Sequence, residues 1–339
     1  MIARVLVQLP FSLAIPDGSS FNLRGIDRDG YTVTFRPPQR PNVSKPKEFA
    51  GTLTINEEPG FETDQLTIDF RKSDFNRSDK TESDPPMEII GDLVNMFLVA
   101  LRHLTQAREI HPLDFPHVTW SLKYLNDDES ELEKAKGQFR GRGLSSFKLP
   151  ATALTPQVWD AVHTLYPTFQ PQRWRDLLLN AEDSIPDLGL MIVLSRTALE
   201  VFIAEALDRL AQDIPTLQAW WNWINGRGFR RNPSTEEQFS DLLQLLTGHN
   251  LQNDTYLWQS FKNLQEARNS FAHAGVAKVG GVPVTREQAI EYVKAARSIT
   301  DLVSSWLPVE RSEPQFTFDI NLKFPAEISY PPSSGDTGA

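Results

Sequence analysis

The chain has 339 residues, 40% of them hydrophobic, and a formal net charge of −10. This length suits two domains of ordinary size, each with enough apolar material for its own core. Cys is absent, which excludes disulfides and thiolate metal sites and fits a reducing, cytoplasmic location. The acidic balance argues against coating of nucleic acid by the whole surface, although a local basic patch can still bind a phosphate backbone.

Residues 1–150 are predicted to form a β-rich domain with one packed helix. The apolar N-terminal run is similar to a signal peptide, but Gln8 and Pro10 interrupt it and no clean cleavage site follows, which favours a strand. No later apolar run reaches the roughly 18 residues that a membrane span requires, so no membrane partner is expected. Strands are expected around 5–9, 31–35, 66–70 and 119–125, turns at 17–18, 29–30 and 59–60, and a helix over 87–108.

Residues 155–308 are predicted to form a helical domain, because apolar residues there recur at the helical period. Two capping boxes, at 234–237 and 285–288, mark helix starts. Gly280 and Gly281 predict a small hairpin between the last two helices. The expected helices begin near 156 and 171 and run over 188–212, 254–275 and 286–307, with a further one behind the first capping box.

The tail returns to a strand pattern. Apolar residues alternate from Phe316 to Phe324, and a lone strand cannot bury such a face by itself. We therefore expect 309–330 to contain a strand that pairs with the N-terminal sheet, and 331–339 to be disordered. The combined pattern predicts an α+β fold, with a β-rich domain, a helical bundle and a strand that returns to the sheet.

The helix predicted between Asp254 and Gly275 ends in a polar group of side chains. Asp254 can cap its first turn, and Gly275 stands where a helix usually stops. On a helical wheel Arg268 falls within the apolar stripe, while His273 lies roughly 140° round from it, beside Asn269. A guanidinium held against an apolar stripe is costly unless something nearby needs its charge.

The hexapeptide R-N-S-F-A-H, from Arg268 to His273, resembles the R-x4–6-H motif of the HEPN superfamily, including the polar residue directly after the Arg. The preceding long helix, with L-S-R-T-A-L-E-V-F-I-A-E-A-L-D-R-L at 194–210, resembles that of Apea-like HEPN domains. The resemblance covers 155–307, under half of the chain. It implies a helical bundle that forms a homodimer through its HEPN helices and cleaves RNA without a metal or any other cofactor.

Enzymes of this kind, as the resemblance implies, attack through the ribose 2′-hydroxyl and leave a 2′,3′-cyclic phosphate. Histidine side chains titrate near neutrality in general, so His273 could take a proton from the 2′-hydroxyl or give one to the leaving oxygen, while Arg268 offers a fork of donors for the phosphate. Asn269 could orient the imidazole or hold the ribose. The implied setting is a toxin–antitoxin or phage-defence system, in which the β-rich domain would sense a trigger or bind an antitoxin or regulatory protein.

Other positions are candidates for supporting roles. Three residues of the earlier long helix are candidate accessory groups, although a solvated helix face explains them equally well: Arg196, Glu200 and Glu205. Three basic residues of one loop could contact RNA phosphates, although a solvated loop is the commoner explanation: Arg227, Arg230 and Arg231. Three residues have ligand-like spacing, but two prolines and the lack of a further ligand favour a loop over a metal site: His111, Asp114 and His117.

Two plainer interpretations stay open for the end of the long helix. Arg268 could be a structural residue whose head reaches out from the stripe, and His273 an ordinary C-terminal helix residue favoured by the dipole. The alternative function is a catalytically inactive HEPN scaffold that dimerises and presents the β-rich domain to a protein partner. In that case Arg268 and His273 would stabilise the interface.

Overall fold

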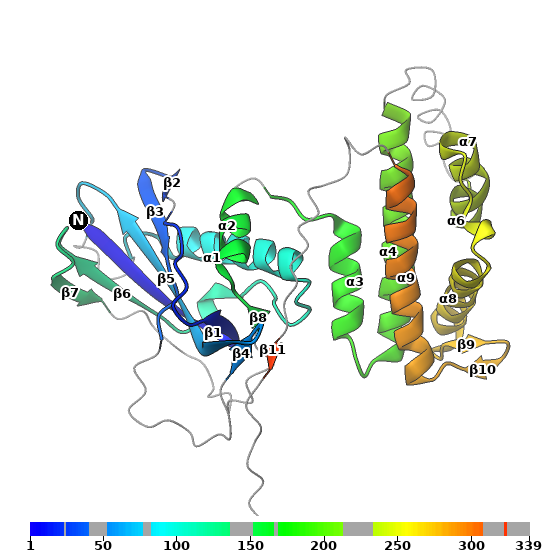
Figure 1. The fold of residues 1–339 in the computed structure, drawn as a ribbon, viewed down its shortest axis with the longest axis horizontal. Coiled ribbons are helices and arrows are strands. Elements are labelled where there is room, and N and C mark those ends of the chain that lie inside the picture. Colours follow the sequence, from blue (N-terminus) through cyan, green and yellow to red (C-terminus); the bar gives the residue numbers. More distant parts are fainter. Residues whose placement is uncertain are drawn as a thin grey trace, which may run out of the picture. The chain divides into compact units, whose positions relative to one another are not determined.

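A computed structural model describes residues 1–23, 25–40, 53–76, 83–135, 152–165, 169–212, 233–307 and 322–323. The chain divides into two compact units, one formed by residues 1–169 with 316–339 and the other by residues 170–315. The first contains an antiparallel sheet and the second consists mainly of helices, as Figure 1 shows. The predicted α+β class is therefore confirmed.

The β-rich unit is built around one long strand, β1 (Ile2–Pro16), which pairs antiparallel with β5 (Glu58–Arg71) on one side and β6 (Trp120–Leu125) on the other. Val5 lies opposite Ile68 and Leu122, so apolar side chains line up on one face. The other described strands of this sheet are β2 (Gly25–Arg28), β3 (Tyr31–Arg36), β4 (Thr54–Ile55), β7 (Glu131–Ala135), β8 (Thr152–Ala153) and β11 (Leu322–Lys323). The four strands predicted in the first region are therefore confirmed.

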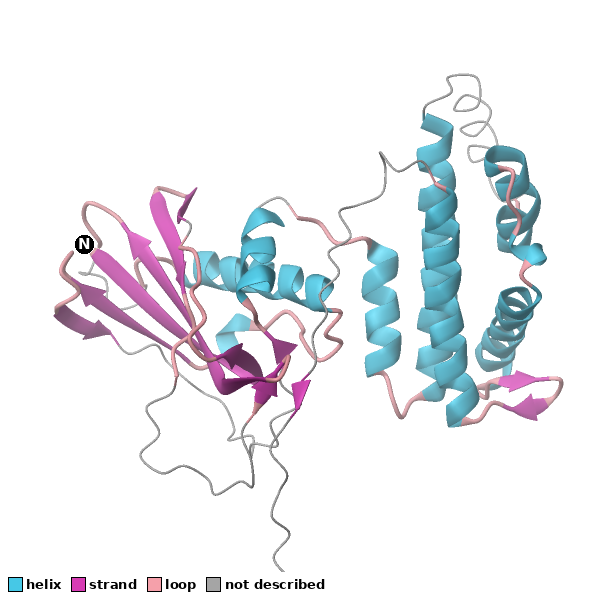
Figure 2. Cartoon of the chain, viewed as in Figure 1, coloured by secondary structure: helices cyan, strands magenta, loops and turns pink. Residues whose placement is uncertain are grey.

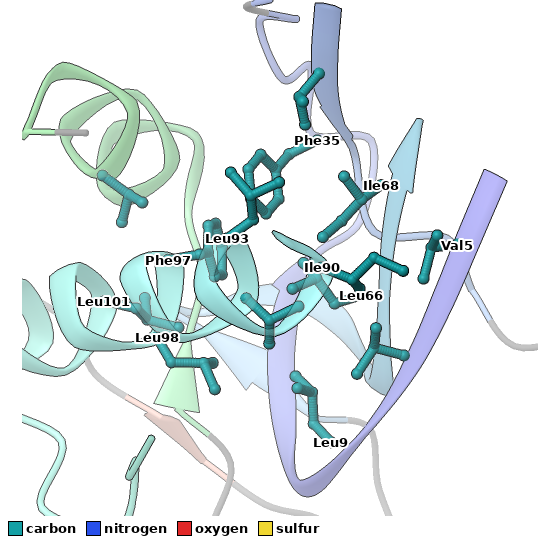
Figure 3. Packing of buried hydrophobic residues seen from close by; sticks show 14 of the residues in the cluster. Val5, Leu9, Phe35, Leu66, Ile68, Ile90, Leu93, Phe97, Leu98 and Leu101 are labelled. Carbon is teal, nitrogen blue, oxygen red and sulfur yellow. The ribbon is translucent and has the colours of Figure 1, made fainter. Parts of the chain in front are cut away.

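Two helices, α1 (Met87–Thr105) and α2 (Pro156–Leu165), complete the core of this unit, together with a short 3-10 turn, η1 (Phe115–His117). Figure 3 shows Phe97 of α1 near Phe35 of β3, and their rings stack with centroids 5.2 Å apart. The α2 helix contributes Trp159, which is fully buried in the same cluster. The predicted helical domain begins at residue 155, whereas α2 belongs to the β-rich unit because it buries its apolar face there.

The turn predicted at residues 59–60 lies elsewhere. The chain reverses at Asn56 and Glu57, whose φ angles of 51° and 71° are in the left-handed region, before β5 begins. Gly60 is part of β5, where an added Cβ atom would lie 2.7 Å from the backbone oxygen of Ile15. The glycine therefore permits a close approach of β1 and β5, and the turn is made by the two residues whose φ angles are positive.

The C-terminal strand was expected to return to the N-terminal sheet, and it does so over two residues. Leu322 and Lys323 form β11, which pairs antiparallel with Ile55 and Thr54 of β4. This pairing confirms the predicted return at these positions. The remainder of the segment predicted as strand, and the tail predicted as disordered, lie outside the described residues.

The helical unit packs around one 25-residue helix, α4 (Leu188–Gln212), whose bounds are those predicted. Figure 2 shows its long neighbours, α3 (Arg173–Asp183), α8 (Thr255–Ala274) and α9 (Arg286–Trp306). Leu199, Phe261 and Ile299 come from three of these helices and meet in a single buried cluster. The shorter elements are α6 (Thr235–Glu237), the π-helical turn η2 (Gln238–Leu242), α7 (Leu243–Thr247), the 3-10 turn η3 (Leu251–Asn253), and the strands β9 (Lys278–Val279) and β10 (Val282–Pro283).

Local sequence signals placed the ends of these elements well. Ser234 and Thr285 each form the predicted capping box, with the third residue of the helix reaching back to the cap. Gly280 and Gly281 join β9 to β10 with φ angles of 58° and 79°, as the hairpin prediction requires. Within the part of the chain that the structure describes, every helix falls short of the length and apolarity that a membrane crossing requires.

Candidate functional site

Helix α8 positions the candidate catalytic residues at its C-terminal end. Its first turn is capped by Asp254, whose Oδ1 accepts a hydrogen bond from the backbone of Leu257 at 2.9 Å. Its last turn closes at Gly275, which has a φ angle of 69° and donates its N–H to the oxygen of Phe271 at 2.8 Å. His273 therefore lies in the last turn, as the sequence predicted.

The polar residues of α8 differ in burial. Its buried residues are Leu257, Phe261, Leu264 and Ala267. Arg268 is half-buried at the edge of this stripe, while Asn269 and His273 are exposed. The Nη1 of Arg268 donates to Oδ1 of Asn269 at 3.2 Å. The sequence analysis expected Asn269 to orient the imidazole of His273 or to hold the ribose. In the single chain, its side-chain oxygen instead accepts a hydrogen bond from Arg268.

A second arginine reaches the same region from α4. Arg196 has only 3% of its surface exposed, and its guanidinium lies 4.9 Å from the ring centroid of Phe261 in α8. Desolvation by burial lowers the pKa of Arg196, the charge of Glu200 raises it, and the positive charge of Arg268 lowers it further. Burial is thus the largest influence on the pKa of Arg196, and Arg268 is the smallest of the three. The interpretation of Arg196 as part of a solvated helix face is therefore wrong, because the side chain is buried.

Glu200 is the acidic neighbour of Arg196, but it neutralises the guanidinium incompletely. The two side chains are one helical turn apart, with Nη1 of Arg196 3.4 Å from Oε1 of Glu200. At this distance the two groups form an ion pair, but they are not aligned for a hydrogen bond. The buried Nη1 of Arg196 has no hydrogen bond among the described residues. The pair contributes little, because the two groups are not aligned and the Glu200 side chain is 39% exposed to solvent.

Gly189 is a residue of this region that the sequence analysis missed. It lies in the first turn of α4, where an added Cβ atom would be 2.0 Å from the ring of Phe271. The absent side chain therefore lets α8 lie close against α4 near the end that carries His273. A glycine inside an otherwise regular helical pattern was the available signal, since it has a conformational cost that close packing can offset.

Some candidate residues lie apart from this group. Glu205 pairs with Arg209 at 3.7 Å and stands nine residues beyond Arg196, which is about 13.5 Å further along α4. Glu200 contacts Arg196, and among the described residues no contact between Glu200 and His273 is found. The basic loop residues Arg227, Arg230 and Arg231 lie outside the described residues.

The described side chains suit phosphate chemistry better than metal binding. No group of three or more His, Asp or Glu side chains in the described ranges is arranged to hold a metal ion. In the β-rich unit, His117 and Asp114 form an exposed pair with 2.6 Å between Nδ1 and Oδ2. In the helical unit, helix α8 carries the half-buried guanidinium of Arg268 with the exposed amide of Asn269 and, one turn further, the exposed imidazole of His273. Such a set can attract a phosphate and move a proton.

Comparisons with protein-family models, with curated proteins and with solved structures found no match for this chain.

Proposed function

We propose that the helical unit is a HEPN-type endoribonuclease, which cleaves RNA without a metal and acts as a homodimer. The observation that carries the proposal is the C-terminal end of α8, which exposes Asn269 and His273 and holds Arg268 half-buried with its guanidinium on Asn269. This set suits a phosphodiester, because arginine offers a fork of donors to phosphate oxygens and an imidazole can move a proton.

The proposed reaction is an internal transfer within RNA. The ribose 2′-oxygen bonds to the adjacent phosphorus while the bond from phosphorus to the 5′-oxygen breaks, which leaves a 2′,3′-cyclic phosphate and a 5′-hydroxyl. His273 takes the proton of the 2′-hydroxyl or supplies one to the leaving oxygen. Arg268 stabilises the charge that builds on the phosphate oxygens. With two copies facing each other, one imidazole serves as base and the other as acid.

The surface around the helix end supports a second copy as the covering partner. Leu190, Val276 and Val282 are large apolar side chains left exposed in this unit. Leu190 follows the glycine that contacts Phe271, and Val276 lies three residues after His273. In a symmetric dimer the same residues are covered on both subunits, so each of these exposed apolar side chains would be buried twice.

The test is RNA cleavage in EDTA by the full chain. Wild type is expected to cleave. His273→Ala is expected to lose about 10²- to 10⁴-fold in rate, the usual contribution of a general acid or base. Arg268→Ala is expected to lose about 10²- to 10³-fold, as when a charge-stabilising donor is removed. His249→Ala is the matched control, because His249 is also exposed in this unit but stacks on Trp306. Cleavage that persists in both site variants removes these residues from the mechanism.

The setting proposed for this activity is cytoplasmic toxin–antitoxin or phage-defence biology. The β-rich unit then restrains the nuclease, senses a trigger or binds an antitoxin. Growth arrest on expression, relieved by His273→Ala but not by His249→Ala, is the expected cellular result. Arrest that both variants retain would separate toxicity from the proposed site.

The alternative is a scaffold that dimerises without catalysis. Its supporting observation is the bond from Arg268 to Asn269 within one helix, which gives the guanidinium a partner in the fold without any substrate. A scaffold predicts that wild type sediments as a dimer, cleaves nothing, and dissociates more readily when Arg268 or His273 is replaced. Sedimentation of the three proteins at several concentrations distinguishes the two functions.

A further inference from the structure

We infer that Lys278, on the hairpin that follows helix α8, binds a phosphate of the RNA strand beside the one that is cleaved. This inference deepens the proposed function and rests on it for the identity of the ligand, a single-stranded RNA. Lys278 is a substrate-binding residue in this arrangement. It holds a neighbouring phosphate and takes no part in the proton transfer at His273.

The hairpin formed by β9 and β10 is fastened to helix α8 at two points, one on each side of Lys278 (Figure 1). The Oγ of Ser270 donates a hydrogen bond to the backbone oxygen of Val276 at 2.9 Å. The backbone N–H of Gly280 donates to Oε1 of Glu266 at 2.7 Å. Lys278 stands midway between Val276 and Gly280 in the chain, so its backbone lies alongside the turn of α8 from Glu266 to Ser270.

This turn is on the side of α8 that carries His273. At about 100° per residue, His273 is about 20° from Glu266 around the helix axis and about 60° from Ser270. At about 1.5 Å per residue, it lies roughly 4.5 Å beyond Ser270 along the axis and roughly 10.5 Å beyond Glu266. A strand whose reacting phosphodiester lies at His273 therefore has a further phosphate within reach of the Lys278 side chain.

The alternation of side chains along β9 directs Lys278 away from the core. Ala277 is buried, and Val279 packs against the core of the helical unit. Because successive side chains of a strand point to opposite faces, Lys278 points outward. Its half-buried state fits a lysine whose carbon stem lies on apolar surface while the ammonium group stays in water.

The fold leaves the charge of Lys278 without a carboxylate. Lys278 has no ion pair among the described residues. Glu266 bonds to the backbone of Gly280 and forms no ion pair with Lys278. Five other cations of the helical unit each pair with a carboxylate: Arg196, Arg209, Lys262, Lys294 and Arg297. The charge of Lys278 is therefore available to an anion from outside the chain.

The experiment measures, by fluorescence anisotropy, the binding of a labelled single-stranded 2′-deoxy oligonucleotide to the full chain at several salt concentrations. This probe carries phosphodiesters but lacks the 2′-hydroxyl, so binding is measured without cleavage. Lys278→Met keeps the apolar stem and removes the charge, and it is expected to weaken binding about three- to tenfold. The slope of the logarithm of affinity against the logarithm of salt concentration should become shallower by about 0.7, the value for one phosphate contact to a single strand.

Lys294→Met is the matched control. Lys294 is an exposed lysine of the same unit that pairs with Glu291 at 2.8 Å, so its replacement removes the same charge from another place. It is expected to leave the Kd within about twofold of wild type and the salt slope unchanged. Lys278→Arg keeps the charge and is expected to retain both the Kd and the slope. Lys278→Met is expected to unfold at the wild-type temperature, because the fold makes no ion pair with this charge.

Three outcomes overturn the inference: a wild-type chain that does not bind the probe, a Lys278→Met variant with the wild-type Kd and salt slope, and equal losses of binding in Lys278→Met and Lys294→Met. The proposed nuclease is tested separately by cleavage of RNA. If Lys278→Met weakens binding as expected while wild type cleaves no RNA, the phosphate contact stands and the catalytic role of His273 falls. If His273→Ala loses cleavage while Lys278→Met binds as wild type, the nuclease stands and this inference falls.

Discussion

Each unit of this protein has an arginine buried or half-buried beside carboxylates, and the two clusters differ in how the described charges are paired. In the β-rich unit, Arg4 donates to both oxygens of Asp69, at 2.8 and 3.0 Å, and Arg36 donates to the same carboxylate at 2.6 Å. Both arginines also contact Glu129. Two cations thus meet two anions, and the buried carboxylate of Asp69 has hydrogen bonds on both oxygens.

The helical unit lacks this arrangement. Arg196 has Glu200 as its carboxylate neighbour, and their contact at 3.4 Å is not a hydrogen bond. A balanced cluster is what a structural role requires, because each buried charge then has its partner within the fold. The difference teaches that the buried guanidinium of Arg196 is compensated among the described residues by the ring of Phe261 and a loose pair with Glu200, and not by a shared, fully hydrogen-bonded carboxylate.

The largest expected effect comes from breaking the balanced cluster. Asp69→Ala leaves two partly buried guanidinium groups without their shared anion, and it should lower the free energy of unfolding by about 3–5 kcal/mol. Urea unfolding of the full chain, followed by a signal from the β-rich unit, measures the loss. A cost below about 1 kcal/mol would show that the two clusters do not differ in the way described.

A smaller loss is expected when the α4–α8 contact is forced apart. Gly189→Ala adds a methyl group that collides with the ring of Phe271, so it should cost about 1–3 kcal/mol of stability. The change should also weaken oligonucleotide binding, because Phe271 lies in the same turns of α8 as the proposed site residues Asn269 and His273. Unfolding and anisotropy measurements on one preparation give both values. A variant more stable than wild type would mean that helix propensity outweighs the clash.

The parts of the helical unit that sequence analysis placed correctly depend on local chemistry. The cap at Asp254, the stop at Gly275 and the capping box at Thr285 each require only neighbouring backbone groups. A side chain that satisfies an unpaired N–H in the first turn does so in any tertiary setting. A glycine with a positive φ angle likewise ends a helix or forms a turn through its own backbone, whatever packs around it. The bounds of α8 and α9 could therefore be predicted almost to the residue.

The parts that could not be predicted depend on which surfaces meet. An amphipathic pattern shows that α2 buries one face, but it does not say that the face packs beside Phe97 in the β-rich unit. In the same way, a helical wheel places Arg196 among polar positions, while its burial comes from α8 lying across it. The exposure of His273 follows from its position in the last turn. Its proposed partner copy does not follow from any local signal.

Glu200→Gln should change stability much less than Asp69→Ala does. The carboxylate is 39% exposed and makes no aligned hydrogen bond to Arg196, so its removal should cost less than about 1 kcal/mol. Urea unfolding of the full chain measures the change. A loss of about 3 kcal/mol or more, the usual cost of breaking a buried ion pair, would place Glu200 in the same class as Asp69.

The smallest expected effect is a pH dependence carried by Glu129. Hydrogen bonds from Arg36 and then from Arg4 hold the pKa of this carboxyl below its usual range. A depressed folded-state pKa means that its stabilising contribution is present above the unfolded value, which is about 4.3, and is lost as pH falls through the folded value. Glu129→Gln should therefore be less stable than wild type at pH 7.

The gap in unfolding midpoint between wild type and Glu129→Gln should close at low pH, because protonated Glu129 then resembles the amide in charge. Glu131→Gln is the matched control, since Glu131 is an exposed carboxylate of the same unit that pairs with Lys123 at 3.3 Å. Its difference from wild type should stay small throughout the titration. A Glu129→Gln gap that persists at low pH would assign the contribution of Glu129 to packing, and the charge balance of the β-rich cluster would then rest on Asp69 alone.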